Sequence, residues 1–183
     1  MQKQFFLILL FLVSVNGFTQ KRYFTKSGNV TFSAGTALED IEAATNTSSS
    51  VFDASTGQIE FAVLIKGFEF KRALMQEHFN ENYMESDRFP KSVFKGRITN
   101  INEVNFEQNG TYPVAVIGSL EIHGVTKQIE AKGIMKVAGE AVSANANFDI
   151  TVSDYNIAIP GLVKDKISKT ATIRVNCNYK LLK

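Results

Sequence analysis

The chain has 183 residues, of which 44% are hydrophobic and 21% charged, with one cysteine and a formal net charge of +2. A single cysteine excludes an intramolecular disulfide, so the fold must rest on packing and backbone hydrogen bonds. The balanced charge, without a Lys/Arg cluster that could follow a phosphate backbone, argues against a nucleic-acid partner. The length predicts one globular domain.

Residues 1–19 have the pattern of a secretory signal peptide. Lys3 supplies a positive charge, an apolar run at 5–15 follows, and small residues come next. The run is short for a membrane span, and an N-terminal anchor is the alternative. No cysteine follows that could carry a lipid anchor. We therefore expect residues 20–183 to form a single mature domain in the periplasm or outside the cell, without an integral membrane segment.

Alternating apolar and polar residues predict strands in the first part of this domain. One strand starts near Gly28, and residues 59–65 form a stronger one that has apolar side chains on both faces. Residues 45–50 are all small and polar, so we expect an exposed loop there, and residues 53–57 are predicted to turn. Gly67 breaks the alternation, which predicts a bulge.

The apolar period changes in the stretch between residues 68 and 98. One side of a helix there would carry Leu74, Met75, His78, Phe79, Asn82 and Tyr83. Such a helix could be a plug, a lid or a packing element of the barrel or sheet built by the flanking strands. Because its stripe is apolar with one polar residue at each turn, we predict that residues 74–83 form a lid across one mouth, ended by Pro90.

Five more strands are predicted after the helix, beginning with residues 92–98. Turns are expected at Asn109-Gly110, His123-Gly124 and Gly139. The last two strands, near 144–152 and 171–181, alternate most regularly. The pattern predicts an all-β fold, an antiparallel eight-stranded barrel with one α-helix that caps a mouth.

Small residues at inward positions decide whether such a barrel is hollow. They are Gly96, Gly118, Ala131, Gly133, Ala144 and Ala146. They could leave a void, or they could accommodate close strand packing or a bulky neighbour such as Phe148. A void lined by Phe, Ile, Val and Met would stay dry and favour an apolar guest.

Two motifs resemble the YceI-like family. One is F-P-x3-F-x-G at 89–96, and the other is G-S-L-E-I-H-G-V-T-K at 118–127. The resemblance covers nearly all of residues 20–183 and implies an exported, lipocalin-like barrel that encloses a long polyisoprenoid chain and has no catalytic residues. Val152 and Asn156 stand where the family commonly has Arg and Gly, so an inward Arg that could meet a lipid head group is absent.

We therefore predict a carrier, store or sequestering protein for an apolar lipid, a polyisoprenoid or an isoprenoid quinone, with no cofactor, metal or catalytic residue. The predicted ligand-binding residues are Phe61, Val63, Ile65, Met75, His78, Phe79, Tyr83, Phe94, Gly118, Leu120, Ala146, Phe148, Ile150, Ile173 and Val175. The alternatives are a ligand-free interaction barrel with a filled interior and an enzyme that acts on the bound lipid. The sequence also leaves open whether the protein forms a homodimer.

The remaining titratable residues offer no metal-binding or catalytic spacing. His78 could hydrogen-bond a backbone carbonyl or the polar end of a ligand, whereas His123, at a hairpin end, is predicted to be exposed. Cys177 has inward parity and is expected to act as a small buried hydrophobe. The charged connection at 154–168 is expected to be a solvated loop rather than a charge-recognition site.

Overall fold

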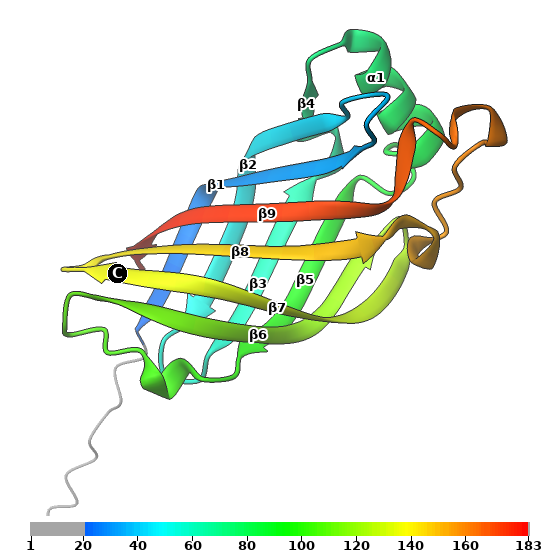
Figure 1. The fold of residues 1–183 in the computed structure, drawn as a ribbon. Coiled ribbons are helices and arrows are strands. Elements are labelled where there is room, and N and C mark those ends of the chain that lie inside the picture. The colour runs from blue at the N-terminus through cyan, green and yellow to red at the C-terminus, as the bar shows by residue number, and fades with distance from the viewer. Residues whose placement is uncertain (1–20, 183) are drawn as a thin grey trace, which may run out of the picture.

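The computed structural model describes residues 21–182 as a closed antiparallel barrel of eight long strands with a short additional strand and one helix (Figure 1). The predicted signal peptide lies outside the described residues. The long strands follow the order β1-β9-β8-β7-β6-β5-β3-β2, and β2 pairs with β1 to close the barrel. Their bounds are β1 Arg22–Gly35, β2 Glu42–Asp53, β3 Gln58–Leu64, β5 Lys91–Ile98, β6 Gly110–Ile122, β7 Val125–Ala138, β8 Ala141–Thr151 and β9 Ile167–Leu181.

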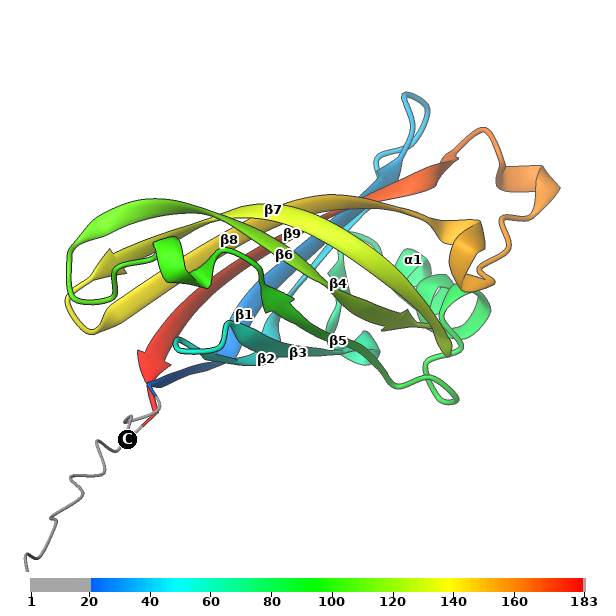
Figure 2. The same cartoon turned by 90° about the horizontal axis from the view of Figure 1, so that it is seen from below.

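The predicted helix is confirmed and lies at one end of the barrel (Figures 1 and 2). It consists of α1, Ala73–His78, continued by a π-helical turn, η2, Phe79–Tyr83. The short strand β4, Glu69–Phe70, precedes it and pairs with the start of β2. No residue of α1 or η2 is fully buried, but Phe79 and Tyr83 of η2 pack against the core cluster at this end of the barrel.

The prediction of an exposed loop at residues 45–50 is wrong, because they form the middle of β2. Ser48 is fully buried, and its hydroxyl donates a hydrogen bond to the Gly28 carbonyl. The hydroxyl of Ser50 donates to the Glu60 carbonyl at 2.8 Å. Small polar side chains normally indicate turns, but here backbone carbonyls of the neighbouring strands satisfy their hydrogen bonds inside the sheet.

The predicted hairpin turn at Asn109-Gly110 is also wrong. Between β5 and β6 the chain makes a longer connection that contains a 3₁₀ turn, η3, Ile101–Glu103. Asn109 serves a different turn, because its side-chain oxygen accepts a hydrogen bond from the backbone N–H of Gly139 at 2.7 Å. An Asn-Gly pair predicts a tight turn from local preference alone, and the tertiary contact overrides that preference.

The turn between β6 and β7 is confirmed. His123 and Gly124 have φ angles of 51° and 73°, and positive values at both central positions are typical of a two-residue hairpin. The break in alternation at Gly67 is a 3₁₀ turn, η1, Ile65–Gly67, rather than a bulge. This turn leads the chain out of β3 and towards the helix.

The core forms two clusters, one at each end of the barrel. At the helix end, Phe32 stacks on Phe79 with ring centroids 5.2 Å apart. At the far end, Phe52 packs between Tyr23 and Tyr179 at centroid distances of 5.0 and 4.9 Å. Phe61 and Val175 pack against both clusters.

Candidate functional site

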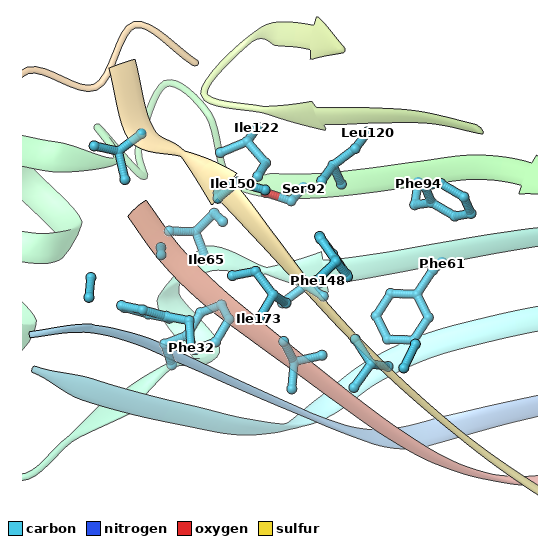
Figure 3. Close-up of a pocket in the computed structure, with 18 of the residues that line it drawn as sticks. Phe32, Phe61, Ile65, Ser92, Phe94, Leu120, Ile122, Phe148, Ile150 and Ile173 are labelled. Carbon is cyan, nitrogen blue, oxygen red and sulfur yellow. The ribbon is translucent and has the colours of Figure 1, made fainter. Parts of the chain in front are cut away.

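An internal cavity of about 580 Å³ extends between the two core clusters. Side chains from all eight long strands contribute to its wall, and Figure 3 shows the middle of it, where Phe61, Phe94 and Phe148 face the interior together with leucine and isoleucine side chains. Its wall is almost entirely apolar. Pockets for drug-sized and lipid ligands have volumes of this order.

Four of the six small inward residues account for the hollow interior. They are Ala131, Gly133, Ala144 and Ala146, all of which line the cavity. Gly133, which has no side chain, pairs with Ala146 across β7 and β8, so only one methyl group faces the interior at this pair. Leucine or isoleucine at the three alanine positions would fill the space, so the void follows from the small side chains there. At Gly133 any side chain is excluded, because a Cβ would lie 2.3 Å from the Asn145 carbonyl oxygen.

Gly96 and Gly118 serve a different purpose, and the prediction that Gly118 lies in the binding surface is not supported. A Cβ atom on Gly118 would lie 2.7 Å from the ring of Phe94, and one on Gly96 would lie 2.6 Å from it. A Cβ at either glycine would also lie within 2.4 Å of a backbone oxygen of the paired strand. The two glycines, paired across β5 and β6, therefore allow the close approach of the strands and provide space for the Phe94 ring. That ring faces the cavity in place of Gly118.

All the other predicted ligand-binding residues line the cavity. The strands and η1 contribute Phe61, Val63, Ile65, Phe94, Leu120, Ala146, Phe148, Ile150, Ile173 and Val175, and the helical segment contributes Met75, His78, Phe79 and Tyr83. Asn82, which the helical period placed on the same face, is exposed and does not reach the cavity. The widened π turn shifts the face that looks inward, a change that a period of 3.6 residues does not anticipate.

The far end of the cavity is closed by buried side chains, among them Phe52, Cys177 and Tyr179. The Tyr179 hydroxyl donates to the Ser50 hydroxyl at 2.9 Å. Burial raises the pKa of the Cys177 thiol to about 11 and also raises the pKa of Tyr179. Both groups are therefore protonated and uncharged at neutral pH, and Cys177 behaves as the predicted small hydrophobe rather than as a nucleophile.

The helix end of the cavity carries charged side chains, which the sequence pattern did not predict. Arg72 immediately precedes α1, Glu39 lies between β1 and β2, and Lys166 precedes β9. The Glu39 carboxylate accepts a hydrogen bond from Arg72 Nη2 at 2.5 Å and forms an ion pair with Lys166 Nζ at 3.3 Å. These two cations hold the pKa of Glu39 below its usual value. Each residue appears in the sequence as a separate loop charge, so nothing in local spacing could reveal the cluster.

The prediction that His123 is exposed is wrong, since its side chain is only 9% exposed. Its Nδ1 lies 3.1 Å from the Tyr155 carbonyl, and its Nε2 lies 3.1 Å from Glu85 Oε1. The ring packs against Phe89 with centroids 4.6 Å apart. His123 thus joins the β6–β7 hairpin to the chain that follows the helix and to the 3₁₀ turn η4, Val152–Tyr155.

The family model of the YceI-like domain matches residues 14–179. A polyisoprenoid binding domain from Saccharophagus degradans implicated in plant cell wall breakdown has a similar fold, with a TM-score of 0.76 at 11% identity over 89% of this chain and 99% of that one. BcnA of Burkholderia cenocepacia has a TM-score of 0.68 at 14% identity over 83% of this chain and 95% of that chain. At these identities the likeness establishes the shared barrel only.

A more distant likeness is to the YceI protein of Campylobacter jejuni, with a TM-score of 0.52 at 16% identity over 73% of this chain and 82% of that chain. A search among curated proteins gives no match. Within residues 21–182, no helix combines the length and apolar character needed to cross a bilayer.

Proposed function

This chain belongs to the YceI-like family, and from that premise we propose that its barrel encloses an apolar lipid of the isoprenoid type and serves as an exported carrier, store or sequestering protein. The observation that carries the proposal is the closed barrel with an almost wholly apolar cavity of about 580 Å³. The similar fold of the S. degradans polyisoprenoid binding domain supports the class of ligand.

Burial of the lipid tail supplies the affinity. A tail that loses roughly 300 Å² of apolar surface to the cavity gains about 7.5 kcal/mol at about 25 cal/mol per Å². Association costs part of this gain, because the lipid loses translational and conformational freedom. The preformed wall of Phe61, Phe94 and Phe148 limits the cost on the protein side, since the residues already face the interior.

The cavity argues against a ligand-free interaction barrel, whose interior would be filled. An enzyme that acts on the bound lipid is the weaker alternative. Among the described residues, Tyr179 of the far cluster and His78 on α1 line opposite ends of the cavity. The carboxylate of the lining, Glu39, is paired with Arg72 and Lys166. Catalysis requires an acid or base beside the reacting group, and burial keeps Tyr179 and Cys177 protonated.

Native mass spectrometry of the protein purified from its own host tests the proposal. We expect a complex whose additional mass is released by organic solvent and is identified as a lipid. A parallel titration with farnesol, a short isoprenoid alcohol, measures uptake by protein from which lipid has been extracted. A single ligand-free mass together with no uptake of farnesol would refute lipid binding.

A further inference from the structure

The charged side chains of the cavity lining gather at one place within the described residues. Glu39, Arg72 and Lys166 are the only Asp, Glu, Lys or Arg residues in that lining, and each comes from a different connection at the helix end. A hydrogen bond from the Thr36 hydroxyl to the Asp165 carbonyl, at 2.8 Å, also joins the β1–β2 connection to the segment before β9. The mouth of an apolar cavity therefore carries one cluster of charged side chains, Glu39, Arg72 and Lys166, which we call the mouth cluster.

This cluster presents its positive groups outward. Arg72 and Lys166 side chains are 62% and 54% exposed, whereas the Glu39 side chain that joins them is 17% exposed. Two cations share one carboxylate, which leaves a formal charge of +1 and N–H groups free to donate. A guanidinium presents a planar fork that matches phosphate oxygens, and an ammonium adds a rotatable donor.

The polar end of a lipid guest is directed to the same place by the shape of the cavity. The far end is closed by Phe52 and Tyr179, and the Tyr179 hydroxyl already donates to Ser50. The wall between the ends is apolar, so an unpaired phosphate there would lose its hydration without compensation. A tail that fills the interior leaves its head at the mouth.

We propose that Arg72 and Lys166 bind the anionic head group of the guest, so that the preferred ligand is an isoprenoid with a terminal phosphate rather than a neutral alcohol or quinone. This inference rests on the proposed lipid binding and adds the class of head group. Glu39 holds the two cations in position when no anion is present, and it competes with the phosphate for them.

Paired titrations with farnesyl monophosphate and farnesol test the inference, because the two probes share a tail and differ in charge. The wild-type protein is expected to bind the phosphate at least about tenfold more tightly, since charge-assisted hydrogen bonds each contribute on the order of a factor of ten. Arg72→Gln and Lys166→Gln should each reduce this ratio severalfold while farnesol affinity stays unchanged. Glu39→Gln should increase the ratio, because it removes the competing carboxylate.

Lys71→Gln is the matched control. Lys71 neighbours Arg72 but forms an ion pair with Asp40 at 2.8 Å and does not line the cavity, so its loss should leave the ratio unchanged. Arg72→Lys keeps the charge without the planar fork and should give an intermediate ratio even if Arg72→Gln unfolds. Circular dichroism of each variant separates loss of fold from loss of binding.

The outcomes distinguish the two proposals. Equal affinity of the wild-type protein for both probes would overturn the head-group site while leaving lipid binding intact, and absence of any farnesol binding would refute lipid binding itself. A parallel loss of both probes in Arg72→Gln would show that the cluster only clamps the mouth. Inorganic phosphate alone should not displace farnesyl monophosphate at equal concentration. Displacement would assign the site to free phosphate instead of a lipid head.

Discussion

The far end and the helix end of the barrel differ in how their side chains are held. At the far end, Phe52 and Met135 are each 1% exposed and lie within a continuous aromatic and aliphatic cluster. At the helix end, Leu38, Leu74 and Leu162 are 72%, 61% and 98% exposed, and ion pairs join the connections around them. Figure 1 places the helix and the 3₁₀ turn η5, Gly161–Val163, at this same end.

Under the proposed function, the contrast places ligand exchange in the exposed connections of the helix end, which lie outside the buried cluster of that end, where Ile65 and Tyr155 are each 2% exposed. Densely packed clusters contribute most of the free energy of unfolding, and segments with few buried contacts open at low cost. A cavity that takes up a lipid, as we propose, needs one end that opens without unfolding the other. The ion pairs of Arg72 and Lys166 with Glu39 suit that requirement, since exposed ion pairs are weak and readily exchanged.

The largest effect on stability is expected from Tyr23→Ala at the far end. The Tyr23 ring stacks on Phe52 and Phe106, at 5.0 and 5.5 Å, and is 3% exposed but does not line the cavity. Removal of a buried aromatic ring costs about 3–5 kcal/mol. Urea denaturation measures this loss, and Tyr23→Phe, which keeps the ring, should lose less than about 1 kcal/mol. If Tyr23→Ala lowered the free energy of unfolding only slightly, the far end would not be the main source of stability.

Ala146→Trp is expected to abolish lipid uptake with a smaller effect on stability. Its side chain faces the cavity beside Gly133, so an indole would fill part of the cavity. Farnesol affinity should fall at least about 100-fold, equivalent to about 3 kcal/mol. Ala141→Trp on the same strand is the control, since Ala141 is exposed and outside the cavity. Unchanged uptake by Ala146→Trp would locate the ligand elsewhere.

Alkaline pH should weaken the far end specifically. Cys177 has a folded pKa of about 11 against a reference of 9.0, because burial favours the neutral thiol. The stabilisation is therefore complete below pH 9 and is lost as the pH rises towards 11, by about 2 kcal/mol from this group. Tyr179 shifts in the same direction. Urea denaturation from pH 7 to 11 measures the loss, which should be smaller in Cys177→Ala; an identical pH dependence would exclude Cys177 as its source.

Strand alternation was enough to predict the barrel and most of its interior. Phe148, Ile150, Ile173 and Val175 belong to long strands in which every second residue faces inward, so one parity choice determines the whole strand. Gly118 shares that parity, but the ring of Phe94 covers it. Parity predicts the direction of a residue and says nothing of the side chain that lies over it.

The parts that the sequence did not predict depend on contacts between distant segments. Ser48 is polar, and only its hydrogen bond to the Gly28 carbonyl makes its burial favourable. His123 becomes buried because Glu85 and Tyr155, both far away in the sequence, supply its partners. The mouth cluster likewise joins residues 39, 72 and 166. Local period and propensity contain no information on such pairings.

The smallest effect on stability is expected from Met75→Ala on α1, the predicted lid. Met75 lines the cavity from α1 and is only partly buried, so its removal should cost less than about 1 kcal/mol of unfolding free energy. The dissociation rate of farnesol should nevertheless increase severalfold, because the side chain closes the mouth over the guest. Stopped-flow transfer of farnesol to acceptor vesicles measures this rate, with Glu77→Ala, which is exposed on the same helix, as the control. A large loss of unfolding free energy with an unchanged dissociation rate of farnesol would show that the helix is a packing element. Both ends of the barrel would then contribute to stability, and the helix end would have no separate part in ligand release.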